Sequence, residues 1–314
     1  MNELGGYFEL ELQRTNEYHQ NAIRLNTGRN AFEYILKGKG YKKVYLPYYT
    51  CDVMLEPIEK LGVSYEFYSI DQSFSPVFDF QKIKEKDAFL YTNYFGLCDK
   101  HVEDISTKVR NLIIDNAQSF YSHTLPEVDT FYSPRKFFGL PDGAYLYTNK
   151  RLQEELEVDV SYQRCEHLLG RIDINASSFY KSFVEADNSL INQSIKQMSR
   201  LTQRLLSSID YERTAKKRIE NFKQLHQVLE TKNKLEFNLA DFGVPMIYPY
   251  LIDNGKELKQ KLIKNKIYVA SYWPNVYDWA KKDSFEYDLV ENLVCLPIDQ
   301  RYGKNEMEII KQLI

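Results

Sequence analysis

The first half of the chain repeats one pattern, in which a short apolar run is followed by a segment with helical spacing and then by the next run. Four of these runs have the length of strands, at residues 42–47, 65–70, 88–96 and 111–120. Strands that alternate with helices form a mainly parallel sheet covered by helices on both faces. We therefore predict an α/β fold for this half.

The helices between these strands have recognisable ends. Residues 29–37 place their apolar side chains on one stripe, and Gly38 and Gly40 close the segment. Thr50 is a candidate N-cap for the next helix, which Gly62 would end.

The second half follows a different pattern. Residues 150–232 are polar, with apolar residues three to four positions apart, which predicts helices that pack along one face. Beyond them, short apolar runs at 242–253 and 267–274 alternate with helices expected at 255–266 and 304–314. This arrangement indicates a small α+β unit.

The length of the chain agrees with two units. At roughly 150 residues per domain, 314 residues suffice for two. We predict a large domain over residues 1–232, which includes the connecting helices, and a small α+β domain over 233–314. Hydrophobic residues make up 43% of the chain and charged residues 27%, as in a packed, enzyme-sized protein.

Charge and cysteine content exclude several classes of protein. A net charge of -3 argues against a dedicated nucleic-acid binder. The chain begins without a secretory pattern and has no run near the roughly 18 apolar residues of a membrane span, so we expect a cytoplasmic protein that does not enter membranes. Four scattered cysteines and five histidines without ligand spacing predict neither a disulfide framework nor a metal site.

Several common catalytic and nucleotide-binding signatures do not occur. The chain has no GxGxxG after its first strand and no GxxxxGK[ST], so dinucleotide and P-loop sites lose their main support. HExxH and GxSxG are missing as well. A Rossmann-type oxidoreductase would fit the α/β pattern but lacks this glycine fingerprint.

Three separated pieces carry candidate site residues. NTGRNAF at residues 26–32 opens a helix with a glycine-containing turn, which is a natural phosphate site. IIDNAQ at 113–118 places Asp115 at a strand end, where ligands of open α/β sheets bind. Asp115 could equally be a helix N-cap or a turn carboxylate, and Asn93 has a similar position. The third piece, residues 129–146, holds Lys136 between a hydroxyl-bearing turn and a glycine.

Together these pieces resemble the DegT/DnrJ/StrS family of pyridoxal-phosphate sugar aminotransferases. Four further segments support the resemblance: VYLPYYTCDVMLEPIEKLGVSYEFYSID, YTNYFG, MSRLTQRLLSSIDYERTAKKRIENFKQL and LVCLPIDQRY. The resemblance covers nearly the whole chain and depends on the ordered set rather than on one motif. It implies the fold type I architecture, with a large mainly parallel sheet domain and a small α+β C-terminal domain.

The resemblance also implies roles for three polar residues. Lys136 would form the Schiff base with pyridoxal phosphate and carry protons during transamination. Asp115 would pair with the pyridinium nitrogen, and Gln118 would contact the side of the cofactor that bears its 3-hydroxyl group. The alternative for Lys136 is a surface lysine in a loop.

The phosphate group of the cofactor would lie at the turn that opens the first helix. By resemblance, Thr27, Gly28, Arg29 and Asn30 form the cradle, and Ser133 donates a hydroxyl. Ser133 could instead cap a turn, and Arg29 could face solvent.

Three features depart from the family pattern. Cys51 occupies the position at which many relatives place an aromatic ring over the cofactor, and Tyr49 or Tyr94 could compensate. Gly143 and Ala144 stand where a pair of glycines is common. The chain is also shorter than the usual relative, which indicates trimmed substrate loops.

The function implied is transfer of an amino group, from glutamate, to a keto group of a nucleotide-linked sugar in polysaccharide biosynthesis. Fold type I further implies a homodimer with the active site at its interface. Arg164 or Arg171 could reach the partner's site, or each could have a surface role. Alternatives are another pyridoxal-phosphate reaction, such as dehydration or elimination, and a non-catalytic or regulatory protein that keeps the fold.

Overall fold

A computed structural model describes residues 4–237 and 243–314. Its main feature is an eight-stranded sheet with the order β1-β8-β7-β6-β5-β2-β3-β4. The strands are β1 (Ile23–Leu25), β2 (Lys43–Pro47), β3 (Ser64–Ile70), β4 (Pro76–Val77), β5 (Asp87–Thr92), β6 (Leu112–Asn116), β7 (Asp129–Tyr132) and β8 (Ala144–Tyr147). The five strands from β7 to β3 run parallel, whereas β8, β1 and β4 are antiparallel to their neighbours. The predicted α/β fold with a mainly parallel sheet is thus confirmed.

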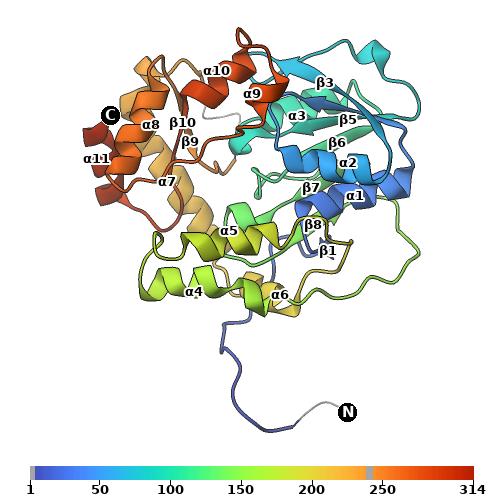
Figure 1. Cartoon of the computed structure of the whole chain (residues 1–314), viewed down its shortest axis with the longest axis horizontal. Helices are drawn as coiled ribbons and strands as arrows, with labels where there is room; N and C mark the ends of the chain where they lie inside the picture. The colour runs from blue at the N-terminus through green and yellow to red at the C-terminus, as the bar shows by residue number, and fades with distance from the viewer. Residues whose placement is uncertain (1–3, 238–242) are drawn as a thin grey trace.

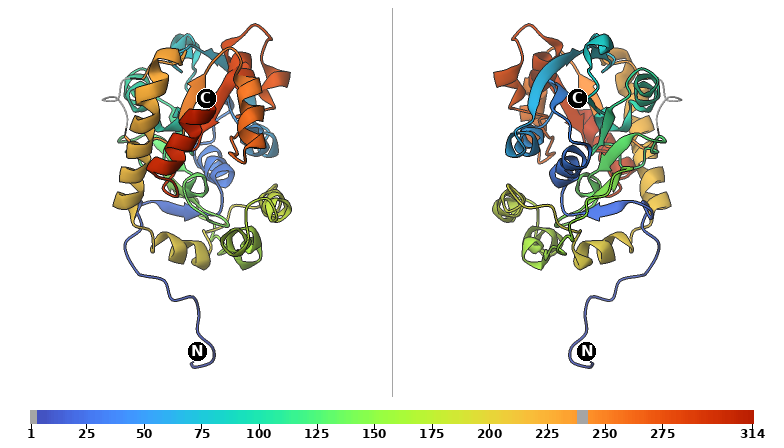
Figure 2. Two further views of the ribbon diagram at one scale, coloured as in Figure 1. Left: turned by 90° about the vertical axis from the view of Figure 1, so that its left-hand side faces the viewer. Right: turned by 90° about the vertical axis from the view of Figure 1, so that its right-hand side faces the viewer.

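Helices lie on both sides of this sheet (Figures 1 and 2). The α-helices are α1 (Gly28–Lys39), α2 (Leu55–Lys60), α3 (Asp99–Ser106), α4 (Glu166–Asp173), α5 (Tyr180–Asn188), α6 (Arg200–Leu206), α7 (Tyr211–Leu229), α8 (Gly255–Lys264), α9 (Val276–Trp279), α10 (Phe285–Asn292) and α11 (Lys304–Leu313). Short 3-10 turns are η1 (Asp52–Met54), η2 (Phe80–Lys82), η3 (Tyr94–Gly96), η4 (Pro134–Lys136), η5 (Tyr162–Arg164) and η6 (Glu230–Lys232).

The strand sequences produce two cores, one on each face of the sheet. Successive side chains of a strand point to opposite faces. In β6, Ile113 therefore packs with α1 and α2, whereas Ile114 joins the larger core that α3 and α7 cover. In β5, Leu90 and Tyr91 divide in the same way. Apolar residues on both faces explain why these strands read as continuous apolar runs.

The C-terminal region forms a second, smaller layer. Strands β9 (Tyr248–Leu251) and β10 (Leu293–Leu296) pair antiparallel, and α8, α10 and α11 pack beside them (Figure 1). The long helix α7 connects this layer to the large sheet and contacts both α11 and β9. The domain boundary at residue 232 stays a prediction; it coincides with the end of η6.

Local structure corrects three details of the sequence-based expectation. Thr50 is not the helix cap, because the helical segment begins as the 3-10 turn η1 after Cys51. The run 111–120 ends as a strand at Asn116, since the Asp115 carboxylate accepts the Ala117 N–H and turns the chain. Residues 267–274 contribute only an isolated bridge between Ala270 and Cys295. Within the described ranges, none of the helices is both long and apolar enough to cross a bilayer.

Replacing a residue of the central strand tests the two-core arrangement. Ile113→Ala removes a fully buried side chain, whose loss should cost about 2–4 kcal/mol in the free energy of unfolding. The matched control is Ile309→Ala in α11, at a position that is half exposed. Urea denaturation measures both variants. Equal losses for the two would contradict the assignment of Ile113 to a packed core.

Candidate cofactor site

Asp115 lies at the carboxyl end of β6, in the centre of the sheet. One carboxylate oxygen accepts the Ala117 N–H at 2.8 Å. Burial raises the pKa of this carboxyl to about 6, although the Ala117 N–H and the charge of Lys136 both oppose the shift. Asp115 is thus a buried acid without a directly bonded cation, which is an unfavourable state unless a ligand supplies the positive group.

Lys136 is brought to Asp115 by the neighbouring strand. Strand β7 pairs with β6, so that Asp115 lies opposite Phe131, and η4 then carries Lys136 over the strand ends. The ammonium charge opposes the rise in pKa that burial causes at both Asp115 and Cys51, so Lys136 lies within electrostatic range of both groups. Its Nζ lies 5.5 Å from the centre of the Tyr272 ring. Three sequence-predicted residues, Asp115, Cys51 and Lys136, therefore interact electrostatically in this structure.

Gln118 and Asn93 have different environments despite similar positions in the sequence. The Gln118 side-chain oxygen accepts the Phe95 N–H at 3.3 Å, whereas its buried Nε2 has no hydrogen-bond partner. The Asn93 amide donates to Asp99 at 2.7 Å and to Asn116 at 3.1 Å. Asn93 therefore supports the turns beneath the site, and Gln118 keeps a free donor.

The N-terminus of α1 lies beside the turn that carries Lys136. Thr27 caps this helix by accepting the Asn30 N–H, and its first turn holds no acidic residue. A Cβ built on Gly28 would lie 3.9 Å from that of Ser133. Two predicted phosphate-binding pieces, which are about a hundred residues apart in the chain, are thus neighbours.

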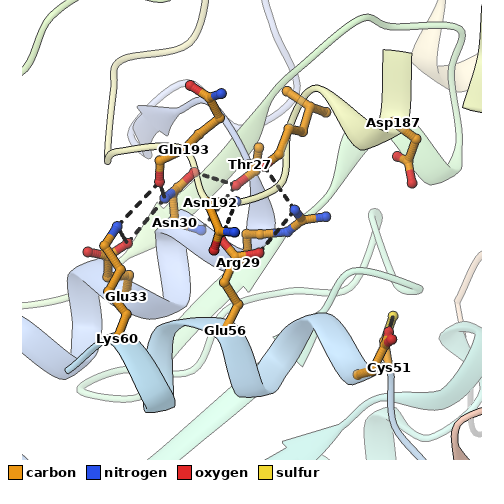
Figure 3. A network of polar contacts seen from close by, with 12 residues as sticks. Thr27, Arg29, Asn30, Glu33, Cys51, Glu56, Lys60, Asp187, Asn192 and Gln193 are labelled. Carbon is orange, nitrogen blue, oxygen red and sulfur yellow. Dashed lines mark hydrogen bonds and ion pairs between the residues drawn. The ribbon is translucent and has the colours of Figure 1, made fainter. Parts of the chain in front are cut away.

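The side chains of Arg29 and Asn30 face protein groups (Figure 3). Arg29 donates to Glu56 at 3.3 Å and to the Leu190 carbonyl at 2.8 Å. The Asn30 amide donates to the Gln193 carbonyl at 2.9 Å. These contacts hold the segment that follows α5 against α1 and α2. The N–H groups of Gly28 and Arg29, at the first two helix positions, are what this end of α1 offers to an anion.

Cys51 precedes η1 and points its thiol toward the acidic side chain of Asp52, with 3.5 Å between Sγ and Oδ1. Burial raises the pKa of this thiol to about 11, against the charge of Lys136. Tyr49 and Tyr94 are the two residues that could replace the aromatic ring missing at position 51. The Tyr94 hydroxyl donates to the Tyr49 carbonyl, and the Tyr49 ring packs on Trp273, so both side chains contact other parts of the protein.

At the two positions where the resembled family often has a pair of glycines, only residue 143 has a backbone conformation that requires glycine. Gly143 has a φ of 119°, and a Cβ at this position would lie 3.1 Å from Thr202. Ala144 begins β8, pairs with Leu25 and is buried, so a methyl group fits there. Arg171 lies in the last turn of α4, and Arg164 forms an ion pair with Asp159.

A cavity of about 690 Å³ opens beside Lys136. It lies between η4, the helices α4, α5 and α7, and the C-terminal layer. Among the described residues that line it, basic side chains outnumber the one acidic side chain, that of Asp299. The cavity is also lined by arginines and aromatic residues, namely Arg135, Arg171, Arg218, Arg301, Phe137, Phe183, Tyr268 and Tyr272. Among residues 4–237 and 243–314, no group of His, Cys, Asp and Glu side chains is arranged to hold a metal ion.

Sequence reasoning did not find two of these residues. Tyr272, over the amine of Lys136, and the buried Arg218 both lie far along the chain from the three motifs. An isolated arginine in an amphipathic helix carries no signal of burial. Only the docking of the C-terminal layer brings both residues to the site.

The raised pKa of Asp115 predicts a pH dependence of stability in cofactor-free protein. Because the folded-state pKa is raised from 3.8 to about 6, ionisation destabilises the folded protein as the pH rises through this interval, by up to about 3 kcal/mol. Asp115→Asn removes that penalty, so its stability relative to the parent should increase between pH 3.5 and 7. Urea unfolding across this range, with the exposed-site variant Asp104→Asn as control, measures the effect. A relative stability that stays flat would contradict the buried, unneutralised state.

The chain was compared with family models, curated proteins and solved structures, and only the solved structures gave matches. DesV of S. venezuelae, solved in complex with a ketimine intermediate, is 13% identical with a TM-score of 0.64, over 92% of this chain and 83% of that one. The sugar aminotransferase Spr1654 from Streptococcus pneumoniae in its PLP form is 14% identical with a TM-score of 0.65, over 93% and 86%.

A third structure, NtdA from Bacillus subtilis with bound PMP, is 14% identical with a TM-score of 0.64, over 93% of this chain and 72% of that one. A DegT DnrJ EryC1 StrS aminotransferase from Brucella abortus, at 14% identity and a TM-score of 0.60, covers 93% and 84%. The likeness extends over nearly all of the chain, and at this identity it concerns the fold. The resemblance read from the sequence is thus confirmed at that level: the chain has the fold of the DegT/DnrJ/StrS aminotransferases.

Proposed function

We propose that the protein is a pyridoxal-phosphate-dependent aminotransferase. The observation that carries this proposal is that Asp115, a buried carboxyl group at the carboxyl edge of the sheet, lies within electrostatic range of the amine of Lys136, which follows the adjacent strand β7. The shared fold supports it, because solved neighbours with that fold are described in PLP and PMP forms.

The residues present fit this cofactor at each of its polar ends. A pyridinium N–H would give Asp115 the positive partner that it lacks. The free Nε2 of Gln118 is a donor for a ring oxygen. The N–H groups that open α1, together with the neighbouring Ser133, suit a phosphate group.

The chain's own residues would divide the chemistry as follows. When bound, pyridoxal phosphate supplies an electron sink that stabilises negative charge at the carbon undergoing transamination. Asp115 holds the proton on the ring nitrogen, and burial keeps water away from that pair. The Nζ of Lys136 would hold the cofactor covalently and, when freed by a substrate amine that takes its place, would move a proton to and from the reacting carbon.

For the substrates, we propose glutamate as amino donor and a keto sugar linked to a nucleotide as acceptor. The cavity supports this choice, because Arg135 and Arg171 in its lining suit a diphosphate, and its aromatic residues Tyr268 and Phe183 suit a nucleotide base or the apolar face of a sugar. The four free cysteines agree with a reducing compartment, and we propose the cytoplasm.

Replacing the lysine tests the proposed reaction. With pyridoxal phosphate and sodium borohydride, the parent protein should gain the mass of the reduced cofactor on the peptide containing Lys136, and Lys136→Ala should not. In Lys136→Ala, the rate at which glutamate converts the cofactor to its amine form should also fall by about 10²–10⁴-fold. The control is Lys150→Ala, an exposed lysine after β8.

The outcome separates the remaining alternatives. Covalent labelling without conversion by glutamate would favour a non-catalytic protein that retains the fold. No labelling at Lys136 would contradict the use of the cofactor altogether. Conversion by glutamate followed by a screen of keto sugar nucleotides would identify the acceptor.

We also propose that the protein is a homodimer that closes the cavity. Helices α4 and α5 expose an apolar surface beside the cavity, made by Leu169, Ile172, Ile174, Tyr180 and Phe183. Ile172 is 82% exposed in the single chain although it lines the cavity. A contiguous apolar surface of this kind marks an interaction site in a globular protein.

A charged residue placed in this surface tests the dimer. Ile172→Glu would bury an unpaired carboxylate at the interface and should raise the dimer dissociation constant by about 100-fold or more. Light scattering after size exclusion measures the mass. Val228→Glu on α7, at a half-exposed position away from this surface, should leave the mass unchanged. A monomeric parent protein would overturn the proposal.

A further inference from the structure

Arg218, in the middle of α7, is the largest fully buried side chain in the described part of the protein, with 1% exposure. Its guanidinium group makes three hydrogen bonds to neutral oxygens. Nε donates to the Gln300 side chain at 3.0 Å, and the two terminal nitrogens donate to the carbonyls of Met246 at 2.9 Å and Phe137 at 3.2 Å. The guanidinium also lies 4.6 Å from the centre of the Phe137 ring.

The Phe137 carbonyl belongs to the residue directly after Lys136. It accepts a second hydrogen bond, from Gln300 Nε2 at 2.8 Å. Gln300 follows β10, so this carbonyl is held from α7 and from the C-terminal layer at the same time. The backbone that carries the amine of Lys136 is therefore fixed by two long-range contacts.

The second carbonyl that Arg218 contacts, that of Met246, belongs to a residue that is linked to Gln118 through Phe95. The Met246 N–H donates to the Phe95 carbonyl at 2.8 Å, and the Phe95 N–H donates to the side chain of Gln118 at 3.3 Å. One continuous series of hydrogen bonds therefore runs from Gln118 through Phe95, Met246 and Arg218 to the turn of Lys136. Arg218 joins the Gln118 part of this series, through the Met246 carbonyl, to the turn of Lys136, through the Phe137 carbonyl.

The chemistry of this position favours arginine over other residues. A planar guanidinium can donate in several fixed directions at once, whereas the ammonium of a lysine is a compact point charge. No carboxylate is among its three hydrogen-bond partners, and the nearby Asp299 is held by Arg301 at 2.7 Å. A buried cation bonded only to neutral oxygens stabilises a protein less than an apolar residue of the same size would, unless its contacts specify a geometry.

We propose that Arg218 is a positioning residue, which locks the turn of Lys136 to the turn of Gln118 when the C-terminal layer docks on the large sheet. This inference rests on the proposed function for the importance of Lys136. The docking of the C-terminal layer then sets the distance between Lys136, which would bind the cofactor covalently, and Gln118, which would contact its ring oxygen. Without the guanidinium, the two turns remain folded but move independently.

Hydrogen exchange of the backbone tests this coupling without any cofactor. In the parent protein, the amides of residues 136–138 donate to Ser133 and Pro134 carbonyls. Arg218→Met keeps the length and apolar stem but removes every donor, and it should accelerate exchange of these amides at least tenfold. The amides of β2, which lie away from this network, should exchange as in the parent. The matched control is Arg213→Met, an exposed arginine on the same helix, with no change in either region.

Two further variants keep the test decisive if Arg218→Met does not fold. Gln300→Leu removes one donor to the Phe137 carbonyl and should accelerate the same amides about threefold. Arg218→Lys keeps the positive charge but not the three directions, so it should resemble Arg218→Met. Unchanged exchange at 136–138, an equal increase in all segments, or full protection in Arg218→Lys would overturn the proposal.

A second measurement connects the coupling to the site and separates it from the proposed function. In protein incubated with pyridoxal phosphate, Arg218→Met should lower the fraction of Lys136 labelled after borohydride reduction by about tenfold. Faster exchange together with undiminished labelling would overturn the positioning role. Absence of labelling in the parent protein as well would overturn the proposed function and leave the exchange result as the test of the coupling.

Discussion

The site depends on the burial of one carboxyl group at the end of a central strand. Asp115 lies in β6 between the buried strands β5 and β7, and in the described part of the chain one backbone N–H, that of Ala117, stabilises its charge by a hydrogen bond. Burying an ionised carboxyl group without a cationic partner lowers the free energy of unfolding of the protein. Asp115 is also the reason that β6 stops where it does, because its side chain turns the chain at Ala117. The hydrogen bond to Ala117 thus ends the strand, whereas the burial of the same carboxyl group favours binding of a positively charged ligand.

The C-terminal layer contacts the loops of the large sheet mainly by donating hydrogen bonds to their main-chain carbonyls. Asn275 donates to the Thr50 carbonyl next to Cys51, and Met246 donates to Phe95, whose N–H holds Gln118. Tyr272 covers the amine of Lys136. The carbonyl that follows Lys136 is held from this side as well. Each of these loops of the large sheet is therefore tied to the same layer, which explains why its docking matters for geometry as well as for stability.

Prediction from the sequence worked best where local rules decide the outcome. The helix that opens at Gly28 and the strands that end near Asn93 and Asp115 follow from apolar periodicity and turn chemistry. The hydrogen bonds of Arg29 to Leu190 and of Asn30 to Gln193 did not follow, because these two carbonyls belong to a segment more than 150 residues further along the chain. The short edge strand β1 also escaped prediction, since three residues carry too little pattern.

The sequence by itself determined the alternation of strands and helices, the order of the three motifs and the residue types that they carry. It did so because strand and helix periodicity, caps and turns are properties of neighbouring residues. Only the tertiary structure decided that Gly28 lies against Ser133, that the charge of Lys136 acts on the buried Asp115, and that Arg218 is buried against Phe137 and Met246. These contacts join residues far apart in the chain, and their energies depend on burial and direction, which exist only once the sheet and its covering layers have packed.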